Sequence, residues 1–184
     1  MKRTILAMSA VFFVLAACGK KEQPAAGAEG QSAGTAQAAQ ANPSYAKKDT
    51  YFRLPNAAGG ELDLSSYAGK PVLVMFFTET CPYCRKAAPF MQKVYSTYGA
   101  KGLGMTGVLV QDEAQPALNF AADFGITFPI AYKGKETSRK YRTQGVPYIY
   151  LLNKDHEIYD VWEGYDPQYD APILKAVETV LAKK

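Results

Sequence analysis

Pro71-Val72-Leu73-Val74-Met75-Phe76-Phe77, followed after three residues by Cys81-Pro82-Tyr83-Cys84, is the stretch that decides the fold. The first seven residues are apolar throughout, which is typical of a central β-strand covered on both faces. The two cysteines open an amphipathic helix, predicted from about Pro82 to Tyr98. The first thiol therefore lies at a helix N-terminus, where unpaired N–H groups and the helix dipole stabilise a thiolate. The second thiol lies one turn further on, within reach of a disulfide with the first.

A dithiol placed in this way can exchange electrons with other thiols. The chain has three cysteines, and the third, Cys18, stands far from this pair. A bridge between Cys81 and Cys84 would close a very short loop and remove little chain entropy, so it would contribute little as a structural staple. Reactivity explains the pair better.

The elements that flank this stretch alternate between strands and helices. Residues 50–55 and 61–64 read as a hairpin around a glycine-containing turn, and residues 103–110 form a second central strand. Because that strand is reached from the first through a helix, the two predict a parallel βαβ unit. The remaining expectations are a helix at 114–124 with Leu118, Ala121 and Ala122 inward, a strand near 128–132, a helix at 136–141, a hairpin of 147–152 with 157–162, and a terminal helix at 172–181.

The N-terminus reads as an export signal. Lys2 and Arg3 precede an apolar run that is too short to span a bilayer, and the run ends Leu15-Ala16-Ala17-Cys18. This ending resembles the bacterial lipoprotein signal box, which implies a signal peptide over residues 1–17 and acyl chains on Cys18. An ordinary signal peptide with a coincidental cysteine is the alternative. Gly19 after the cysteine favours sorting to the outer membrane of a Gram-negative bacterium, with the protein facing the periplasm.

Residues 18–49 are predicted to be the lipidated cysteine and a flexible tether. The segment is rich in Ala, Gly, Gln, Ser and Pro and cannot bury enough surface to fold, and its root-mean-square span would be about 30 Å. Residues 50–184 then form one domain with 15 Lys+Arg against 14 Asp+Glu. Because this domain is nearly neutral and has no concentrated basic patch, nucleic acid is not an expected partner.

Three features together resemble the thioredoxin fold: the helix-leading Cys81-x-x-Cys84 motif, Pro89, and Gly145-Val146-Pro147 before a strand. The lead-in from Gly60 to Pro71 is similar to that of the TlpA/ResA/CcmG-like membrane-anchored thioredoxins. The resemblance covers essentially all of residues 50–184. It implies an α/β, thioredoxin-like fold whose central mixed sheet is flanked by helices, with an N-terminal β-hairpin extension and a strand–helix insertion.

The resemblance also implies a role for each site residue. Cys81 matches the attacking cysteine, Cys84 the resolving cysteine, and Pro147 the proline that is cis in this family. The Val146 backbone would pair with an extended substrate, while Pro82 and Tyr83 would adjoin it. No metal or further cofactor is expected beyond the redox-active Cys81–Cys84 disulfide.

Other positions depart from the family pattern. Met75 stands where cytoplasmic thioredoxins carry a buried aspartate that relays protons, and Thr80 replaces a common tryptophan. Glu79 is a candidate substitute relay to Cys84, although a solvated position at the strand end is the favoured interpretation. The dipeptide Pro82-Tyr83 is more reminiscent of glutaredoxins than of thioredoxin or its TlpA-like relatives. The sequence therefore indicates the type of reaction better than the direction in which electrons flow.

Two further groups of residues invite a functional interpretation. His156, the sole histidine, could bind a metal, but it falls in a tight turn, and histidine tolerates left-handed backbone angles better than most residues do. The turn is therefore the favoured interpretation. Trp162 and four tyrosines most often indicate strand packing or a solvated surface; the tyrosines are Tyr141, Tyr148, Tyr150 and Tyr159. A subset of them near Pro147 could instead line a peptide groove.

The leading hypothesis is a lipid-anchored thiol–disulfide oxidoreductase of the cell envelope that reduces protein disulfides, as in cytochrome c maturation or envelope thiol homeostasis. Its partners would be cysteine-containing envelope proteins, a membrane thiol electron donor, and the membrane itself. A dithiol oxidase is the first alternative. A peroxidase is another, with Thr78 three residues before Cys81 but Val74 in place of the expected proline. Two further alternatives are a copper chaperone that uses Cys81, Cys84 and His156, and a lipoprotein that only binds a partner.

Overall fold

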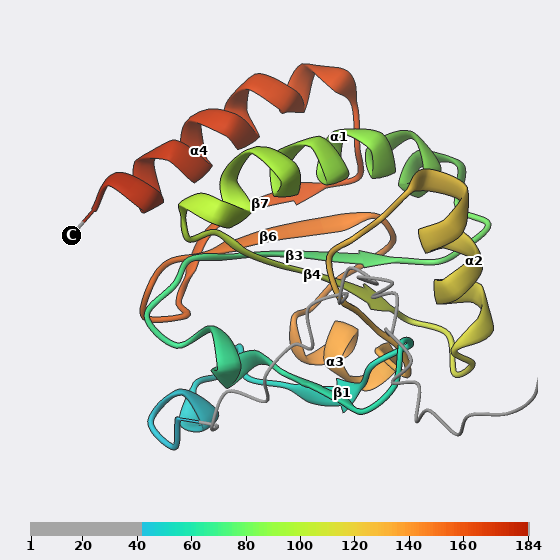
Figure 1. Cartoon of the computed structure of the whole chain (residues 1–184), viewed down its shortest axis with the longest axis horizontal. Helices are drawn as coiled ribbons and strands as arrows, with labels where there is room; N and C mark the ends of the chain where they lie inside the picture. The colour runs from blue at the N-terminus through green and yellow to red at the C-terminus, as the bar shows by residue number, and fades with distance from the viewer. Residues whose placement is uncertain (1–41, 184) are drawn as a thin grey trace, which may run out of the picture. The chain divides into compact units, whose positions relative to one another are not determined.

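The computed structural model describes residues 42–183, which form a five-stranded sheet, a separate two-stranded hairpin and four α-helices (Figure 1). The strands are β1 (Arg53–Pro55), β2 (Glu61–Asp63), β3 (Val72–Phe77), β4 (Gly104–Leu109), β5 (Ile130–Ala131), β6 (Tyr148–Leu152) and β7 (Ile158–Glu163). The helices are α1 (Pro82–Tyr98), α2 (Gln115–Phe124), α3 (Lys135–Lys140) and α4 (Asp170–Ala182). Four short 3-10 helices complete the elements, among them η1 (Tyr45–Lys47) and η4 (Pro167–Tyr169).

Strand β3 is the centre of the large sheet, whose strand order is β5-β4-β3-β6-β7. It pairs in parallel with β4 and antiparallel with β6, which makes the sheet mixed. All six residues of β3 are buried, as an apolar strand covered on both faces must be. Along it, Leu73, Met75 and Phe77 point into one core cluster, and the residues between them point into a second.

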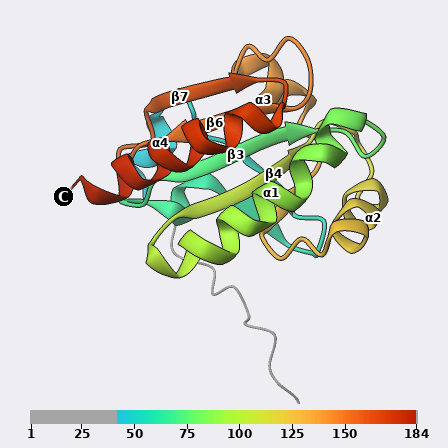
Figure 2. The same cartoon turned by 90° about the horizontal axis from the view of Figure 1, so that it is seen from above.

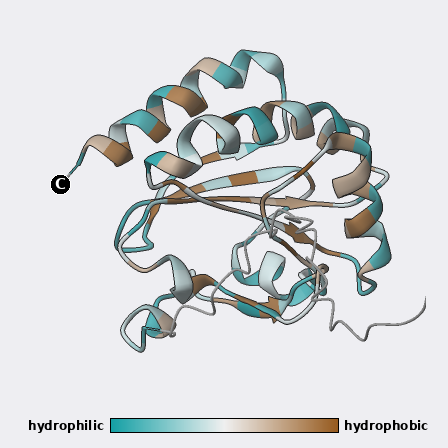
Figure 3. Ribbon diagram, viewed as in Figure 1, coloured by the Kyte–Doolittle hydropathy of each residue, from teal (hydrophilic) through white to brown (hydrophobic). Residues whose placement is uncertain are grey.

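The two faces of the sheet are covered differently. Helices α1 and α4 lie side by side on one face, while α3 and the β1–β2 hairpin lie on the other (Figure 1). In the view from above, α1 and α4 lie over the sheet and run roughly along its strands (Figure 2). Colouring by hydropathy places apolar residues along the sheet and on the helix faces that meet it (Figure 3). The predicted thioredoxin-like α/β architecture, with its hairpin extension and its insertion of α2 and β5, is therefore confirmed.

Most predicted elements have the expected bounds, but the buried face of α2 was predicted wrongly. Ala117 and Phe120 are buried, whereas Leu118 is 40% exposed and Ala122 is also exposed. Of the three residues predicted inward, only Ala121 packs against the core, where it is partly buried. This helix carries apolar residues on several sides, so the sequence pattern alone did not select the face that meets the sheet.

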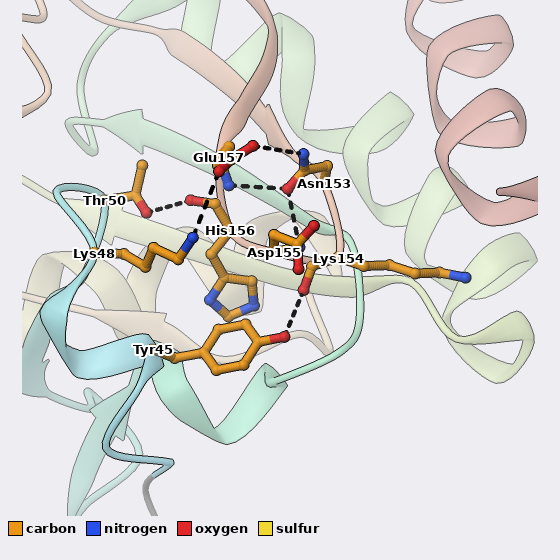
Figure 4. A network of polar contacts seen from close by, with 8 residues as sticks. All are labelled: Tyr45, Lys48, Thr50, Asn153, Lys154, Asp155, His156 and Glu157. Atoms are coloured by element: carbon orange, nitrogen blue, oxygen red, sulfur yellow. Dashed lines mark hydrogen bonds and ion pairs between the residues drawn. The ribbon is translucent and has the colours of Figure 1, made fainter. Parts of the chain in front are cut away.

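The folded domain also begins earlier than the predicted boundary at residue 50. Tyr45 in η1 donates a hydrogen bond to the Lys154 carbonyl (2.9 Å) and accepts one from the Gly69 amide (3.0 Å), and its ring meets His156 edge-on. Lys48 forms an ion pair with Glu157 (3.5 Å). Figure 4 shows this network holding the N-terminal segment against the turn between β6 and β7.

The predicted signal peptide, Cys18 and most of the predicted tether lie outside the described residues. Among the helices of residues 42–183, none is both long and apolar enough to cross a bilayer.

Candidate active site

Cys81 occupies the N-cap of α1. Its sulfur accepts a hydrogen bond from the Cys84 backbone N–H (3.3 Å), and Pro82 takes the first helical position, where a missing N–H does no harm. The Cys81 thiol also donates to the Val146 carbonyl at 3.4 Å. A backbone donor at a helix N-terminus therefore faces the sulfur, an arrangement that suits a thiolate.

Cys84 lies one turn deeper and is fully buried, whereas Cys81 is partly exposed. Burial raises the pKa of the Cys84 thiol well above its ordinary value, and the hydrogen bond to Cys81 raises it further. A hydrogen bond with the Thr78 backbone acts in the opposite direction but does not offset these effects. The pair is thus asymmetric. The Cys81 sulfur is partly accessible, whereas the Cys84 sulfur is buried and remains a protonated thiol.

The loop before β6 completes the site. The Val146–Pro147 peptide bond is cis, as the resemblance implied, and the Pro147 carbonyl accepts a hydrogen bond from the Gly164 amide (2.9 Å). Of the predicted substrate-contacting residues, Tyr83 is 56% exposed and Pro82 is also exposed, both at the start of α1. The structure thus brings Cys81, Val146 and Pro147 together from two elements that lie more than sixty residues apart.

The buried region behind Cys84 has no carboxylate in the part of the chain that the structure describes. Met75 is fully buried in the same core cluster as Cys84. The Glu79 carboxylate instead accepts a hydrogen bond from the Asn119 side chain (2.9 Å) on α2, and no hydrogen bond among residues 42–183 joins it to either cysteine. The structure therefore places Glu79 just beyond the end of β3, half-buried and hydrogen-bonded to α2.

The three ligands of the copper hypothesis are not brought together. Leu152 pairs with Val72 at the N-terminal end of β3, so His156, just beyond β6, lies at the end of the sheet opposite Cys81. Within residues 42–183 no group of three potential metal ligands forms. His156 has φ +58°, which confirms the left-handed turn, and its ring is buried with Nε2 3.1 Å from the Tyr67 carbonyl.

Three of the tyrosines singled out in the sequence are packing residues, as the favoured interpretation held. Tyr141, Tyr148 and Tyr150 are buried in the second core cluster. A cavity of about 240 Å³ beside Val146 and Pro147 is lined instead by Tyr83, Tyr165 and Tyr169, together with Glu163 and Asp166. Nothing in the local sequence pattern shows that the end of β7 and the loop after it lie beside the start of α1. Their cavity-lining residues, Glu163, Tyr165, Asp166 and Tyr169, were therefore not predicted.

Comparison with known families adds to this geometry. Residues 46–161 match the model of the AhpC/TSA family. The chain belongs to that family.

Curated relatives share this region. ResA of Geobacillus kaustophilus, named a thiol-disulfide oxidoreductase, is 30% identical over 114 residues, which is 61% of this chain and 66% of that protein. ResA of Bacillus thuringiensis is 26% identical over 119 residues, which is 64% and 69% of the two chains. The matches therefore span about two thirds of the length of these relatives.

Solved structures show the same fold. A Chlorobium tepidum protein provisionally named thiol:disulfide interchange protein DsbE superposes with a TM-score of 0.68 at 26% identity, over 72% of this chain and 94% of that one. Peroxiredoxin Q of Xanthomonas campestris reaches 0.62 at 18% identity, over 71% and 91%. The second likeness concerns the fold alone, so the chemistry has to be argued from the site.

Proposed function

We propose that this protein is a thiol–disulfide oxidoreductase of the cell envelope that reduces disulfides in other proteins. The observation that carries the proposal is the asymmetric dithiol, with accessible Cys81 beside Val146 and cis Pro147 and with Cys84 buried one turn deeper. The names of the ResA and DsbE relatives support the same reaction type.

The reaction proceeds by two exchanges. The Cys81 thiolate attacks one sulfur of a substrate disulfide, forming a mixed disulfide and releasing the other substrate sulfur as a thiolate. The Cys84 thiol then loses its proton and attacks the Cys81 sulfur, which frees the second substrate thiolate. Two electrons pass to the substrate, and the protein is left with a Cys81–Cys84 disulfide. A membrane thiol donor must reduce that disulfide before the next turnover.

The resemblance of the N-terminus to a lipoprotein signal supports attachment to the membrane through Cys18, in the outer membrane of a Gram-negative bacterium. Replacing Cys18 with alanine should then move the protein from the membrane fraction to the soluble fraction, while a Ser32→Ala control within the same segment should not. Retention of the Cys18→Ala protein in the membrane would contradict lipid attachment at this residue.

Trapping tests the reaction itself. The Cys84→Ser protein should accumulate mixed disulfides with envelope proteins, because the second exchange cannot occur, and these should disappear on reduction. Cys81→Ser should trap none and should be inactive in reducing a disulfide-bonded test protein. Equal activity of Cys81→Ser and the parent chain would overturn the proposal.

A further inference from the structure

The cavity of about 240 Å³ beside the dithiol is formed where three parts of the chain meet. Tyr83 comes from the start of α1, Val146 and Pro147 from the cis loop, Glu163 from the end of β7, and Tyr165 and Asp166 from the connection between β7 and α4. Val146 also contacts the Cys81 sulfur, through its carbonyl at 3.4 Å. A peptide whose cysteine reacts with Cys81 would therefore place a neighbouring side chain at this cavity.

The cavity carries negative charge that is not neutralised. Glu163 and Asp166 line it, and no Lys, Arg or His does. Among residues 42–183, neither carboxylate has an ion-pair partner, although that of Glu163 accepts a hydrogen bond from the Tyr148 hydroxyl on the neighbouring strand. One Asp166 oxygen accepts the Gln168 amide of η4 (3.0 Å), which fixes that side chain at the cavity rim.

The aromatic part of the cavity is held in place. Tyr165 is buried, its hydroxyl donates to Asp170 (2.7 Å), and its ring packs against Phe90. One cation outside the lining residues approaches this aromatic group: the Lys86 ammonium lies 5.2 Å from the centroid of the Tyr83 ring. Carboxylates beside tyrosine rings attract an ammonium or guanidinium group through both charge and the ring quadrupole.

We propose that this cavity binds the side chain of a lysine or arginine that stands next to the reactive cysteine of the substrate protein. The inference rests on the proposed function and adds a substrate preference to it. Glu163 and Asp166 supply the charge, and Tyr83 and Tyr165 supply the apolar walls along the alkyl stem. A substrate with an acidic residue at that place would meet like charge.

Peptide disulfides test this preference. Three short peptides, identical except for Lys, Gln or Glu beside a single cysteine, are prepared as symmetric disulfides, with the variable residue placed in turn before and after the cysteine. Each is reacted with the reduced full chain at low salt, and every rate is divided by the rate of the same peptide with dithiothreitol. This division removes the effect of the neighbouring charge on the peptide sulfur itself.

The normalised rate should be greatest for Lys and smallest for Glu, by about two- to fivefold per carboxylate, and the differences should shrink as salt is added. The double variant Glu163→Gln, Asp166→Asn should lose the Lys-over-Glu preference, so that its normalised rates on the Lys and Glu peptides converge. Asp160→Asn serves as the matched control, because it removes one exposed carboxylate from the same strand outside the cavity.

Equal normalised rates for all three peptides, or a preference that survives the double variant, would overturn the inference while leaving the oxidoreductase intact. Failure of the proposed function gives a different result, in which no peptide is reduced faster by the parent chain than by Cys81→Ser.

Discussion

The rate of the second exchange, in which Cys84 attacks the mixed disulfide, should depend on pH. Burial raises the pKa of its thiol, so at neutral pH only a small fraction is thiolate, and no buried carboxylate among residues 42–183 stands ready to take its proton. The thiolate fraction of such a group rises about tenfold per pH unit below its pKa. Cys81, by contrast, is partly exposed and faces a backbone donor.

We therefore expect release of substrate from the mixed disulfide to accelerate by about tenfold per unit between pH 6 and pH 8. Rapid quenching with acid and mass spectrometry of the intermediates would measure this step. Formation of the mixed disulfide by Cys84→Ser, measured over the same range, provides the control for the first step. A release rate that is flat across this range would show that another group deprotonates Cys84.

The buried ring of His156 leads to a second prediction, on the pH dependence of stability. Its ring is buried against Tyr45, and burial lowers its pKa below the ordinary value. Below about pH 6.5 the unfolded chain therefore binds a proton that the folded chain does not, so stability is full above that pH and is lost as the pH falls toward the folded pKa.

The free energy of unfolding should accordingly fall more steeply between pH 7 and pH 5 in the parent chain than in His156→Asn, by up to about 1.4 kcal/mol per unit. Asparagine is the suitable replacement because it also tolerates the left-handed angles at this position. Urea unfolding at several pH values measures the slopes. Parallel slopes in the two proteins would mean that His156 does not titrate in this way.

At the scale of elements, the close packing of α3 against the sheet depends on Gly134. A Cβ atom added there would lie 2.4 Å from a Val108 methyl carbon and 2.8 Å from the Leu109 carbonyl oxygen. Because the oxygen belongs to the backbone of β4, it cannot move aside easily.

Gly134→Ala should lower the free energy of unfolding by about 1–3 kcal/mol, the usual cost of overpacking. Gly145→Ala is the control, since a Cβ there meets nothing within 4 Å and the backbone has no positive φ. Equilibrium unfolding in urea compares the two. Equal stabilities would indicate that α3 can shift away from β4 without cost.

The elements also show what the sequence could predict. The apolar run of β3 and the motif that follows it were sufficient to place α1 from Pro82 to Tyr98, because the N-cap and the hydrophobic spacing agree. The inward face of α2 was not predictable in the same way, since apolar residues surround that helix. Only its contact with the sheet decides that Phe120 is buried and Leu118 is not.

At the scale of the whole molecule, the N-terminal segment and the dithiol lie at opposite ends of the sheet. Tyr45 contacts the β6–β7 turn, which adjoins the start of β3, whereas Cys81 follows its end. Six residues of strand separate the two ends by about 20 Å. A membrane attachment that enters the domain beside Tyr45 would therefore leave the dithiol at the far end, open to partners.

The contacts of η1 predict that residues 42–49 contribute to stability. A chain that starts at Asn42 should be more stable than one that starts at Thr50 by about 1–3 kcal/mol, because the shorter chain loses the two hydrogen bonds of Tyr45 and its contact with His156. Thermal or urea unfolding of both chains makes the comparison, with Tyr45→Phe in the longer chain isolating the hydroxyl. Identical stabilities would restore the boundary at residue 50.

The active site was predictable only where a motif carries it. Cys81, Cys84 and Pro147 follow from spacing and resemblance, and the structure brings them together as expected. Glu163, Tyr165 and Asp166 follow from neither, because their place beside Tyr83 depends on how the β7–α4 connection crosses the end of the sheet. The composition of residues 42–49 did not indicate a folded segment either, because Tyr45 is the one aromatic residue among them.

The reduction potential of the Cys81/Cys84 pair decides whether the dithiol acts as a reductant. Equilibration of the protein in thiol buffers, with the two redox forms separated after alkylation, measures that potential. We expect a value near that of thioredoxin, about −270 mV. A value near −120 mV would identify a strong oxidant that introduces disulfides, and would contradict the proposed direction.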